Sequence, residues 1–560
     1  NSGRYVMVFN GEMYNYSEVK SKIRDYAFRT SGDSEVLLAA YLKWGADSIK
    51  HFRGMFAFAI WDKHEKELFI CRDRMGVKPL YYFFDEEKIL FASEVRSILA
   101  SGMVKRTVDQ NALIDYFSYQ SISAPHSIIK GIRQLKAGVW MKIKAGKIEE
   151  KVYWDVTNTK ADFDFNDTKK TQKHINELML QSVERRLVSD VPVGAFLSGG
   201  IDSSAVVGLM AAASSARPNT FNISFHEKEF DESEYAEIVA KKFNTNHENI
   251  LLKPTTFLDE LHNSLNALDS PSGDGINTYV VSKAIKQKGI TVALSGVGGD
   301  ELFAGYPIFS QYLKLQQKKS LWSIPYAIRN AFAKIALNGA INGKKNRIKQ
   351  LINLDSCSIE NVYPIFRQIL SPAQIKEYTR ISDDATIVTA IQNELINKEE
   401  HLHAMPLLSQ ISAADYIGYT QQTLLKDTDQ MSMAVSLEVR EPFFDQDLVE
   451  FVLAVPDSLK KPAYPKSLLV ESLKPLLPDE IVFRKKKGFL FPWDMWMKSE
   501  LKSFCDEQIK NISSRSFIDG DRLNNYWKCF LKGDENIRWI EIWLFVVLGY
   551  WLEKNNIDSE

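Results

Sequence analysis

Two regimes of hydrophobic patterning divide this chain. Through residue 155, short apolar segments are separated by polar turns, whereas after Asp190 apolar strand-like segments alternate with amphipathic stretches. Strands joined by tight turns favour antiparallel sheets. Strand and helix in alternation favour a parallel sheet covered by helices. The pattern therefore predicts an α+β antiparallel N-terminal domain, residues 1–155, followed by an α/β domain.

The N-terminal regime opens on a strand from Tyr5 to Glu12. A helix from Val36 to Trp44 follows, and Ser and Asp in the stretch 30–35 are expected to cap it. An antiparallel meander should then run through Met55–Trp61, Glu67–Arg72, Leu80–Phe84 and Ile89–Ser93. A helix at Leu113–Tyr119 and a strand pair across 131–143 complete this part.

The second regime begins after residues 156–172, a linker whose polar stretch 162–170 should be exposed. The expected domain covers 173–560, with a helix at 173–187 and a mostly helical C-terminal third that includes 415–435. The expected strands and helices between are Phe221–Phe225, Glu232–Phe243, Glu248–Leu252, Thr256–Leu268, Tyr279–Lys288 and Ile290–Leu294. The apolar run Trp539–Leu552 is too short to span a bilayer and contains Glu541, so it should be a buried helix.

Composition narrows the class of protein. The 560 residues include 70 basic and 71 acidic side chains, so the net charge favours neither nucleic acid nor membrane as a partner. The four cysteines, Cys71, Cys357, Cys505 and Cys529, are far apart, which argues against zinc and a disulfide framework and is consistent with a reducing cytoplasm.

The stretch Ala195–Ser204 carries the clearest chemistry. An apolar strand ends in Ser-Gly-Gly-Ile-Asp-Ser-Ser and an amphipathic segment follows, so strand, tight loop and helix are expected. Glycines allow close backbone approach, and free amides at a helix start favour an anion. Ser198, Ser203 and Ser204 add hydroxyl donors. Asp202 would repel a bare phosphate, so Mg²⁺ is implied between them.

This Ser-Gly-Gly-x-Asp-Ser spacing resembles the pyrophosphate loop of ATP-pyrophosphatases, and no Gly-x-x-x-x-Gly-Lys-Ser/Thr motif occurs. The N-terminal part is similar to the glutaminase domain of glutamine-dependent asparagine synthetases. The motifs that carry this resemblance are Asn10–Asn15, Gly54–Asp62, Arg72–Tyr82 and Phe91–Glu94. It implies an Ntn-hydrolase-like sandwich before an ATP-pyrophosphatase domain.

The resemblance implies roles for four N-terminal residues. Asn10 and Gly11 would form an oxyanion hole, and Asn10, Gly11, Glu12 and Asp33 would bind glutamine, the two carboxylates holding its ammonium group. The family's cysteine nucleophile should lie upstream of Asn1. Either the sequence has lost its start or the enzyme uses free ammonia, and as written it is not expected to hydrolyse glutamine.

The second family signature is Ser295-Gly-Val-Gly-Gly-Asp-Glu, on a strand end that should share the edge of Ser198. The resemblance implies that Asp300 shares Mg²⁺ with Asp202. It also implies an ATP site made of Leu197, Ser198, Gly199, Gly200, Asp202, Ser203, Ser204, Ile223, Ser295 and Gly296. Lys466, in Pro465–Leu469, is the implied catalytic cation for the transition state at the α-phosphorus.

Two residues depart from the family pattern. Val297 stands where the family carries Glu or Asp, and valine can neither ionise nor accept a hydrogen bond. Either another carboxylate, with Asp274 as a candidate, takes the role of the missing Glu or Asp, or the acid that receives the nitrogen is not aspartate. Glu441 stands where the family prefers an apolar residue. The basic run 484–489 is interpreted as a loop near the triphosphate or a solvated face.

The resemblance covers nearly the whole chain and implies an asparagine synthase. Aspartate would attack ATP to give an aspartyl-adenylate, and ammonia from glutamine would displace AMP. The expected partners are aspartate, glutamine or ammonia, ATP and a possible second copy in a homodimer. Two alternatives stay open: a family member acting on a sugar acid, natural product or β-lactam precursor, and a tRNA-modifying pyrophosphate-loop enzyme.

Overall fold

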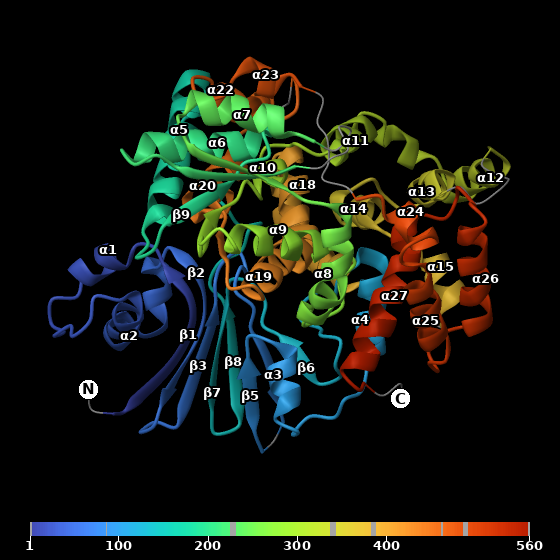
Figure 1. The fold of residues 1–560 in the computed structure, drawn as a ribbon, viewed down its shortest axis with the longest axis horizontal. Coiled ribbons are helices and arrows are strands. Elements are labelled where there is room, and N and C mark those ends of the chain that lie inside the picture. The colour runs from blue at the N-terminus through green and yellow to red at the C-terminus, as the bar shows by residue number, and fades with distance from the viewer. Residues whose placement is uncertain are drawn as a thin grey trace.

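The computed structural model describes residues 3–85, 87–224, 231–336, 343–381, 388–460, 463–484 and 491–557. In Figure 1 the N-terminal strands form the lower part of the molecule and the parallel-sheet region lies above them. The last helices of the chain stand at the side of both.

The N-terminal part contains two antiparallel sheets. The larger has the order β1-β2-β3-β7-β8, with strands Tyr5–Met13, Gly54–Asp62, Glu67–Arg72, Val139–Lys144 and Lys147–Val152. The smaller has the order β5-β4-β6, with strands Ile89–Ala92, Tyr81–Phe84 and Ile132–Gln134. The expected α+β antiparallel character is confirmed.

Both faces of the larger sheet are apolar, since successive residues of a strand point to opposite sides. Phe56, Phe58 and Ile60 of β2 pack with the buried residues of α2 (Asp33–Trp44) on one face. Ala57 and Ala59 pack on the other face with residues of the smaller sheet. The small alanine side chains allow the two sheets to approach each other.

The expected meander is wrong in one respect. Strands β2 and β3 pair, and β4 and β5 pair, but the two hairpins belong to different sheets. Strands β6 and β7 likewise lie in different sheets and do not pair with each other. The intervening segment 73–80 contains the buried Asp73, whose carboxylate accepts backbone hydrogen bonds from residues 56, 75, 77 and 78 and so holds the crossing chain in place.

The predicted parallel sheet is present, with the order β11-β10-β9-β12-β13. Its strands are Asn246–Leu251, Asn219–Ser224, Val193–Phe196, Val292–Leu294 and Glu438–Arg440. Strand β13 was not predicted, because three residues with two charges show no apolar run. All neighbouring strands are parallel, with Leu294 opposite Ala195 and Arg440 opposite Leu294. Their carboxyl ends therefore share one edge.

The helices agree with the pattern except at their ends. Helix α2 begins at Asp33 after Gly32 and has no side-chain cap, so the expected capping by Ser and Asp is wrong. Helix α5 (Thr168–Leu187) begins earlier than predicted, and Phe163 just before it packs on Phe451 with ring centroids 4.9 Å apart. The segment 162–170 is therefore only partly exposed, because its aromatic side chains pack inward.

The other helices of the first 302 residues are α1 (Tyr16–Ser21), η1 (Gly45–His51), α3 (Val95–Ala100), α4 (Gln110–Tyr119), α6 (Ile201–Ala213), α7 (Ser233–Lys242), α8 (Pro254–Ala267), α9 (Ile276–Lys286) and α10 (Gly299–Leu302). The helices from there to residue 433 are α11 (Pro307–Gln316), η2 (Lys319–Ser323), α12 (Tyr326–Ala336), α13 (Gly343–Ile352), α14 (Ile359–Arg367), α15 (Pro372–Tyr378), α16 (Ala390–Asn397), α17 (Glu399–Ala404), α18 (Leu407–Asp415), η3 (Tyr416–Leu424) and α19 (Leu425–Met433).

The remaining helices are η4 (Pro442–Phe444), α20 (Gln446–Ala454), α21 (Asp457–Lys460), α22 (Ser467–Ser472), α23 (Asp479–Val482), α24 (Trp493–Lys498), α25 (Lys502–Ser513), α26 (Gly520–Leu531) and α27 (Trp539–Lys554). Helix α27 is buried along most of its length, as predicted. Among the described residues, no helix is long and apolar enough to cross a bilayer.

Trp543 in the middle of α27 tests how far this helix supports the fold. Its side chain is fully buried and packs 4.6 Å from the ring of Trp493. We expect Trp543→Ala to lower the free energy of unfolding by about 3–5 kcal/mol, because it leaves a cavity. Urea unfolding measures this. Trp61→Ala, at a tryptophan that is 38% exposed, is the control and should change stability far less; equal losses in the two variants would contradict the assignment of α27 to the core.

Candidate functional site

The two glycine-rich loops lie side by side at the carboxyl edge of the parallel sheet. They follow β9 and β12, which pair with each other. A Cβ atom on Gly296 would lie 2.8 Å from the backbone nitrogen of Ser203, so the loops touch and position 296 has no room for a side chain. The sequence prediction that both loops share one edge is therefore confirmed.

Lys466 lies between the two carboxylates that the sequence assigned to a metal. Its Nζ donates to Asp202 and lies 2.8 Å from Oδ1 of Asp300. The lysine is buried; burial lowers its pKa, but the two carboxylates outweigh this and raise the pKa above its usual value. The charged ammonium form of Lys466 is thus favoured at the sheet edge.

Backbone geometry makes room for this triad. A Cβ on Gly299 would lie 2.2 Å from Oδ1 of Asp202, and one on Gly305 would lie 2.0 Å from Oδ1 of Asp300 and 2.4 Å from Cε of Lys466. Lys466 itself has a positive φ of 60°, the left-handed region that most side chains avoid. Strain of this kind is retained where a site requires it.

The first loop has the form expected of an anion cradle. Gly199 has φ of 67°, and a Cβ there would lie 2.5 Å from Cβ of Tyr235. The amide of Gly200 donates weakly to Ser198 Oγ at 3.4 Å, and the hydroxyls of Ser198 and Ser203 lie 3.1 Å apart. Ser204 is buried in the first turn of α6. The loop therefore brings hydroxyl groups and the first backbone amides of α6 together, which is an arrangement that can bind an anion.

The remaining residues expected around adenosine are also near this edge. The amide of Leu197 donates to the carbonyl of Phe221 at 2.8 Å, and Ile223 lies further along the same neighbouring strand, β10. Ser295 directly follows β12, and its Oγ accepts from the amide of Val297 at 3.2 Å. These side chains come from three adjacent strands, which is the arrangement that a nucleotide at a sheet edge requires.

The pair Asp202 and Asp300 is chemically suited to Mg²⁺. This ion is bound in proteins by one or two carboxylates, with substrate phosphates and water completing its shell. No cluster of three or more His, Cys, Asp or Glu suited to a metal occurs among the described residues. Two carboxylates without a full protein cage therefore fit a metal that arrives with a phosphate-bearing substrate.

A second buried cluster, missed by the sequence reasoning, adjoins Asp300. Glu301 accepts a hydrogen bond from Tyr306 at 2.8 Å, and burial raises its pKa to about 7. Arg367 binds Asp415 through two hydrogen bonds of 2.9 and 2.7 Å and lies over the ring of Tyr306. Glu301 and Tyr306 are five positions apart, but Arg367 lies 61 positions beyond Tyr306 and 48 positions before Asp415, so no local pattern indicates the whole cluster.

The four residues expected to bind glutamine gather around β1. Asn10 Nδ2 donates to Ser93 Oγ at 3.1 Å, so two of the family motifs meet there. Asp33 accepts from the amide of Met13 at 2.9 Å, which brings it to the end of the strand that carries Glu12. Gly11 has φ of 142°, and a Cβ there would lie 2.1 Å from the carbonyl oxygen of Met55. The expected grouping is present.

A direct link joins this cluster to the parallel sheet. The guanidinium of Arg440 on β13 lies 3.7 Å from Glu12 and also donates to Glu438. The carbonyl of Arg440 accepts from the amide of Ser295 at 2.9 Å. Burial and the neighbouring charge of Glu438 raise the pKa of Glu12 to about 7. One residue therefore contacts both candidate sites.

Val297, which departs from the family pattern, and Asp274, its candidate substitute, lie in different surroundings. Val297 is half-buried and packs against the main apolar core. Asp274 is half-buried, burial raises its pKa, and its carboxylate accepts a hydrogen bond from the amide of Gly275 at 3.0 Å. Its role as the replacement carboxylate stays a prediction.

Glu441 is buried at the junction of the two parts. Burial raises its pKa to about 8, although Lys78 and Arg186 act in the opposite direction. It lines a cavity of about 20 Å³ together with Met55, whose carbonyl lies against Gly11. A space of this volume holds a single water-sized molecule. The cavity lies where the start of β2 meets the segment that follows β13.

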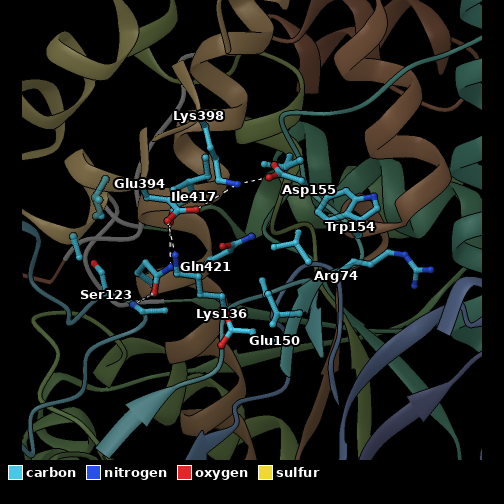
Figure 2. Close-up of a pocket in the computed structure, with 18 residues that line it drawn as sticks. Arg74, Ser123, Lys136, Glu150, Trp154, Asp155, Glu394, Lys398, Ile417 and Gln421 are labelled. Atoms are coloured by element: carbon cyan, nitrogen blue, oxygen red, sulfur yellow. Dashed lines mark hydrogen bonds and ion pairs between the residues drawn. The ribbon is translucent and has the colours of Figure 1, made fainter. Parts of the chain in front are cut away.

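A larger cavity, of about 120 Å³, also lies at this junction but contains none of the predicted site residues. Figure 2 shows Lys398 directed toward Asp155, and Glu394 between Lys136 and Lys398. The Lys136–Glu394 pair is 2.6 Å long. These ion pairs cross from the N-terminal part to α16 and hold the two parts together.

Of the basic run 484–489, Arg484 is described and the other five residues lie outside the described residues. Its guanidinium binds Glu232 at 2.5 Å and lies 3.8 Å from where a Cβ on Gly200 would be. The beginning of this run therefore lies next to the first glycine-rich loop.

Comparison with known proteins gives consistent matches. A family model described as asparagine synthase matches residues 174–553, and one described as a glutamine amidotransferase domain matches residues 1–154. Asparagine synthetase [glutamine-hydrolyzing] 1 of Bacillus subtilis is 30% identical over 99% of this chain and 87% of its own length. A putative asparagine synthetase [glutamine-hydrolyzing] of Methanocaldococcus jannaschii is 36% identical over 67% of this chain and 73% of its own. Amidase chyE of Penicillium rubens is 27% identical over 97% of this chain and 86% of its own length.

The buried carboxyl of Glu441 should make stability depend on pH. Its folded pKa, about 8, exceeds its ordinary value of 4.5, so its contribution to stability is greatest at low pH and is lost as pH rises from 4.5 to 8. We expect Glu441→Gln to become more stable than the wild type over this range, by at most about 1.4 kcal/mol per pH unit. Thermal melting from pH 5 to 9 measures this. Glu507→Gln, at an exposed site, is the control; a Glu441→Gln advantage that is constant with pH would contradict the prediction.

Proposed function

Because this chain belongs to the family of glutamine-dependent asparagine synthetases, we propose that it makes asparagine from aspartate through an aspartyl-adenylate. Membership supports an ATP-dependent amidotransferase. The observation that carries the finer proposal is the buried ammonium group of Lys466, held between Asp202 and Asp300 at the edge where two glycine-rich loops meet.

The first step of the proposed reaction is adenylation. A carboxylate oxygen of aspartate attacks the α-phosphorus of ATP, the bond to the β-phosphate oxygen breaks, and pyrophosphate leaves. Negative charge accumulates on the phosphoryl oxygens in the transition state, and Lys466 is the cation placed to stabilise it. The amides and hydroxyls of the Ser198 loop would bind the departing pyrophosphate, since they form a cradle for an anion.

Mg²⁺ fits this site, and Asp202 and Asp300 would hold it. When bound, the ion supplies positive charge that neutralises the polyphosphate. In the structure, both carboxylates contact Lys466, so the same two residues orient the lysine. We therefore propose that the two aspartates position both the ammonium group of Lys466 and Mg²⁺ at the phosphate chain.

The second step transfers nitrogen. Ammonia attacks the acyl carbon, the bond between that carbon and the AMP oxygen breaks, and the amide, AMP and a proton are formed. In the intact protein, glutamine would supply the ammonia after the family's cysteine nucleophile attacks its side-chain amide. Glu12 and Asp33 would bind the ammonium group of glutamine, and Asn10 and Gly11 would stabilise the oxyanion formed in that attack. The clustering of these four residues at the end of β1 supports this proposal.

A second candidate function keeps the adenylation step and changes the acid. Val297 favours it, because an apolar residue stands where the family has a carboxylate. The similarity to Amidase chyE, a protein not named for asparagine, is consistent with this alternative. In that case a sugar acid, a natural-product acid or a β-lactam precursor would replace aspartate.

Isotope exchange between pyrophosphate and ATP distinguishes the two. Each candidate acid is added in turn, and exchange occurs only when that acid is adenylated reversibly. We expect aspartate to support exchange and the other acids to support at least about tenfold less. Exchange that depends on another acid, with none from aspartate, would replace the first proposal by the second. No exchange with any acid would contradict both.

Substitution of Lys466 tests its proposed role in adenylation directly. We expect Lys466→Met to reduce exchange, with the acid that supports it, by about 10²–10³-fold, as for loss of a group that stabilises transition-state charge. Lys474→Met is the matched control, because Lys474 is exposed and pairs with Glu471 on the surface. Comparable activity in the Lys466→Met variant and the wild type would exclude this lysine from the reaction.

A further inference from the structure

The chain between Glu301 and Asp355 has an unusual charge pattern. It contains no Asp or Glu and nine Lys or Arg: Lys314, Lys318, Lys319, Arg329, Lys334, Lys344, Lys345, Arg347 and Lys349. The near-zero net charge of the whole chain does not reveal this local excess. The described parts of the segment include α11, η2, α12 and α13.

Helix α12 carries a large apolar face that is exposed. Ile328, Phe332 and Ile335 recur at helical spacing and are 60%, 64% and 81% exposed. Leu321, Ile324 and Tyr326 just before them are also exposed. Single exposed apolar residues are ordinary, but a contiguous group of this size marks an interaction site.

The opposite face of α12 fixes its orientation. Arg329 and Ala333, four residues apart, are both buried. The guanidinium of Arg329 donates to the carbonyls of Ile324 and Leu354 at 2.9 and 2.8 Å. The helix is thus anchored to the molecule by one face, and the isoleucine and phenylalanine side chains are held outward.

Exposed lysines lie close to this apolar face in the sequence. Lys318 and Lys319 precede it, Lys334 lies on the same helix, and Lys345 and Lys349 follow on α13. In Figure 1, α12 lies at the outer edge of the molecule, well away from the N-terminal strands. The exposed apolar residues and Lys334 therefore belong to a helix at the periphery of the molecule.

We propose that α12 and the lysines around it form a surface that binds an anionic lipid bilayer. An amphipathic helix with apolar side chains on one face and lysines beside it lies in the plane of a membrane interface, where acyl chains cover the apolar face and anionic headgroups attract the cations. The proposed contact is peripheral. It is independent of the proposed reaction, since none of these residues belongs to the candidate site.

Two other occupants are disfavoured by charge and chemistry. A second copy of the chain in a two-fold dimer would place this basic segment against itself, because an isologous interface pairs the same patch on both subunits. A nucleic acid would neutralise the lysines, but its phosphates would leave Ile328 and Ile335 uncovered. An anionic bilayer satisfies both parts of the surface.

Vesicle sedimentation with the whole chain tests the proposal. One set of vesicles contains phosphatidylcholine alone. The other contains phosphatidylcholine with about 30% phosphatidylglycerol, whose anionic headgroups attract basic segments. We expect binding to the anionic vesicles to be at least about tenfold stronger than to the neutral ones and to weaken as salt is raised from 0.05 to about 0.3 M, because screening shortens the reach of the lysine charges.

Variants separate this surface from the rest of the protein. Ile328→Ser with Ile335→Ser should reduce binding to anionic vesicles by about tenfold or more, because the inserted apolar area is lost. Ile148→Ser, at an exposed isoleucine on β8, is the matched control and should bind as the wild type does. All substituted positions are exposed, so circular dichroism should be unchanged.

Three results would overturn the proposal. They are absence of binding to anionic vesicles, equal binding of the wild type and the double variant, and a wild-type dimer in light scattering that becomes a monomer in the double variant. The last result would assign the apolar face to a second copy of the chain. Retained pyrophosphate exchange in a variant that no longer binds vesicles is expected, so failure of this proposal leaves the proposed reaction unaffected.

Discussion

The contact of one buried ammonium group with two carboxylates organises this molecule. Asp202 and Asp300 begin helices that follow different strands of the parallel sheet, and Lys466 reaches them from 166 positions beyond the second. The two half-buried carboxylates would repel each other without a cation, and the ammonium group of Lys466 neutralises this repulsion between the two loops. Gly299 and Gly305 provide the room. The same contact that stabilises the loops leaves a cation where phosphates would bind.

The second constraint lies at the junction of the two parts. Arg440 contacts Glu12 through its side chain and Ser295 through its backbone, so the cluster around β1 and the carboxyl edge of the parallel sheet are linked through one residue. Tyr14 packs under the guanidinium groups of Arg186 and Arg440. Glu441 and a water-sized cavity lie in the same interface. In the proposed reaction, ammonia would pass from one part to the other, and these contacts would hold the two parts together during that transfer.

The sequence predicted the strand–helix alternation, the two glycine-rich loops on one edge and the buried α27, because these follow from local pattern. It missed β13, since three residues carry no periodic signal, and it joined two hairpins into one meander, since pairing depends on how Asp73 holds the crossing chain. The Glu301–Tyr306–Arg367 cluster depends on contacts distant in sequence. Domain boundaries and individual site roles stay predictions. The basic segment that contains α12 was not noticed in the sequence, because the charge was summed over the whole chain.

The most direct measurement follows the oxygen atoms of the acid. Aspartate labelled with ¹⁸O in its side-chain carboxylate is turned over with ATP and ammonia, and the products are analysed by mass spectrometry. If the carboxylate attacks the α-phosphorus beside Lys466, one labelled oxygen must leave with AMP when ammonia forms the amide. Label in AMP is the predicted result. Label in inorganic phosphate, with ADP as the other product, would mean attack at the γ-phosphorus and would contradict the account of this site.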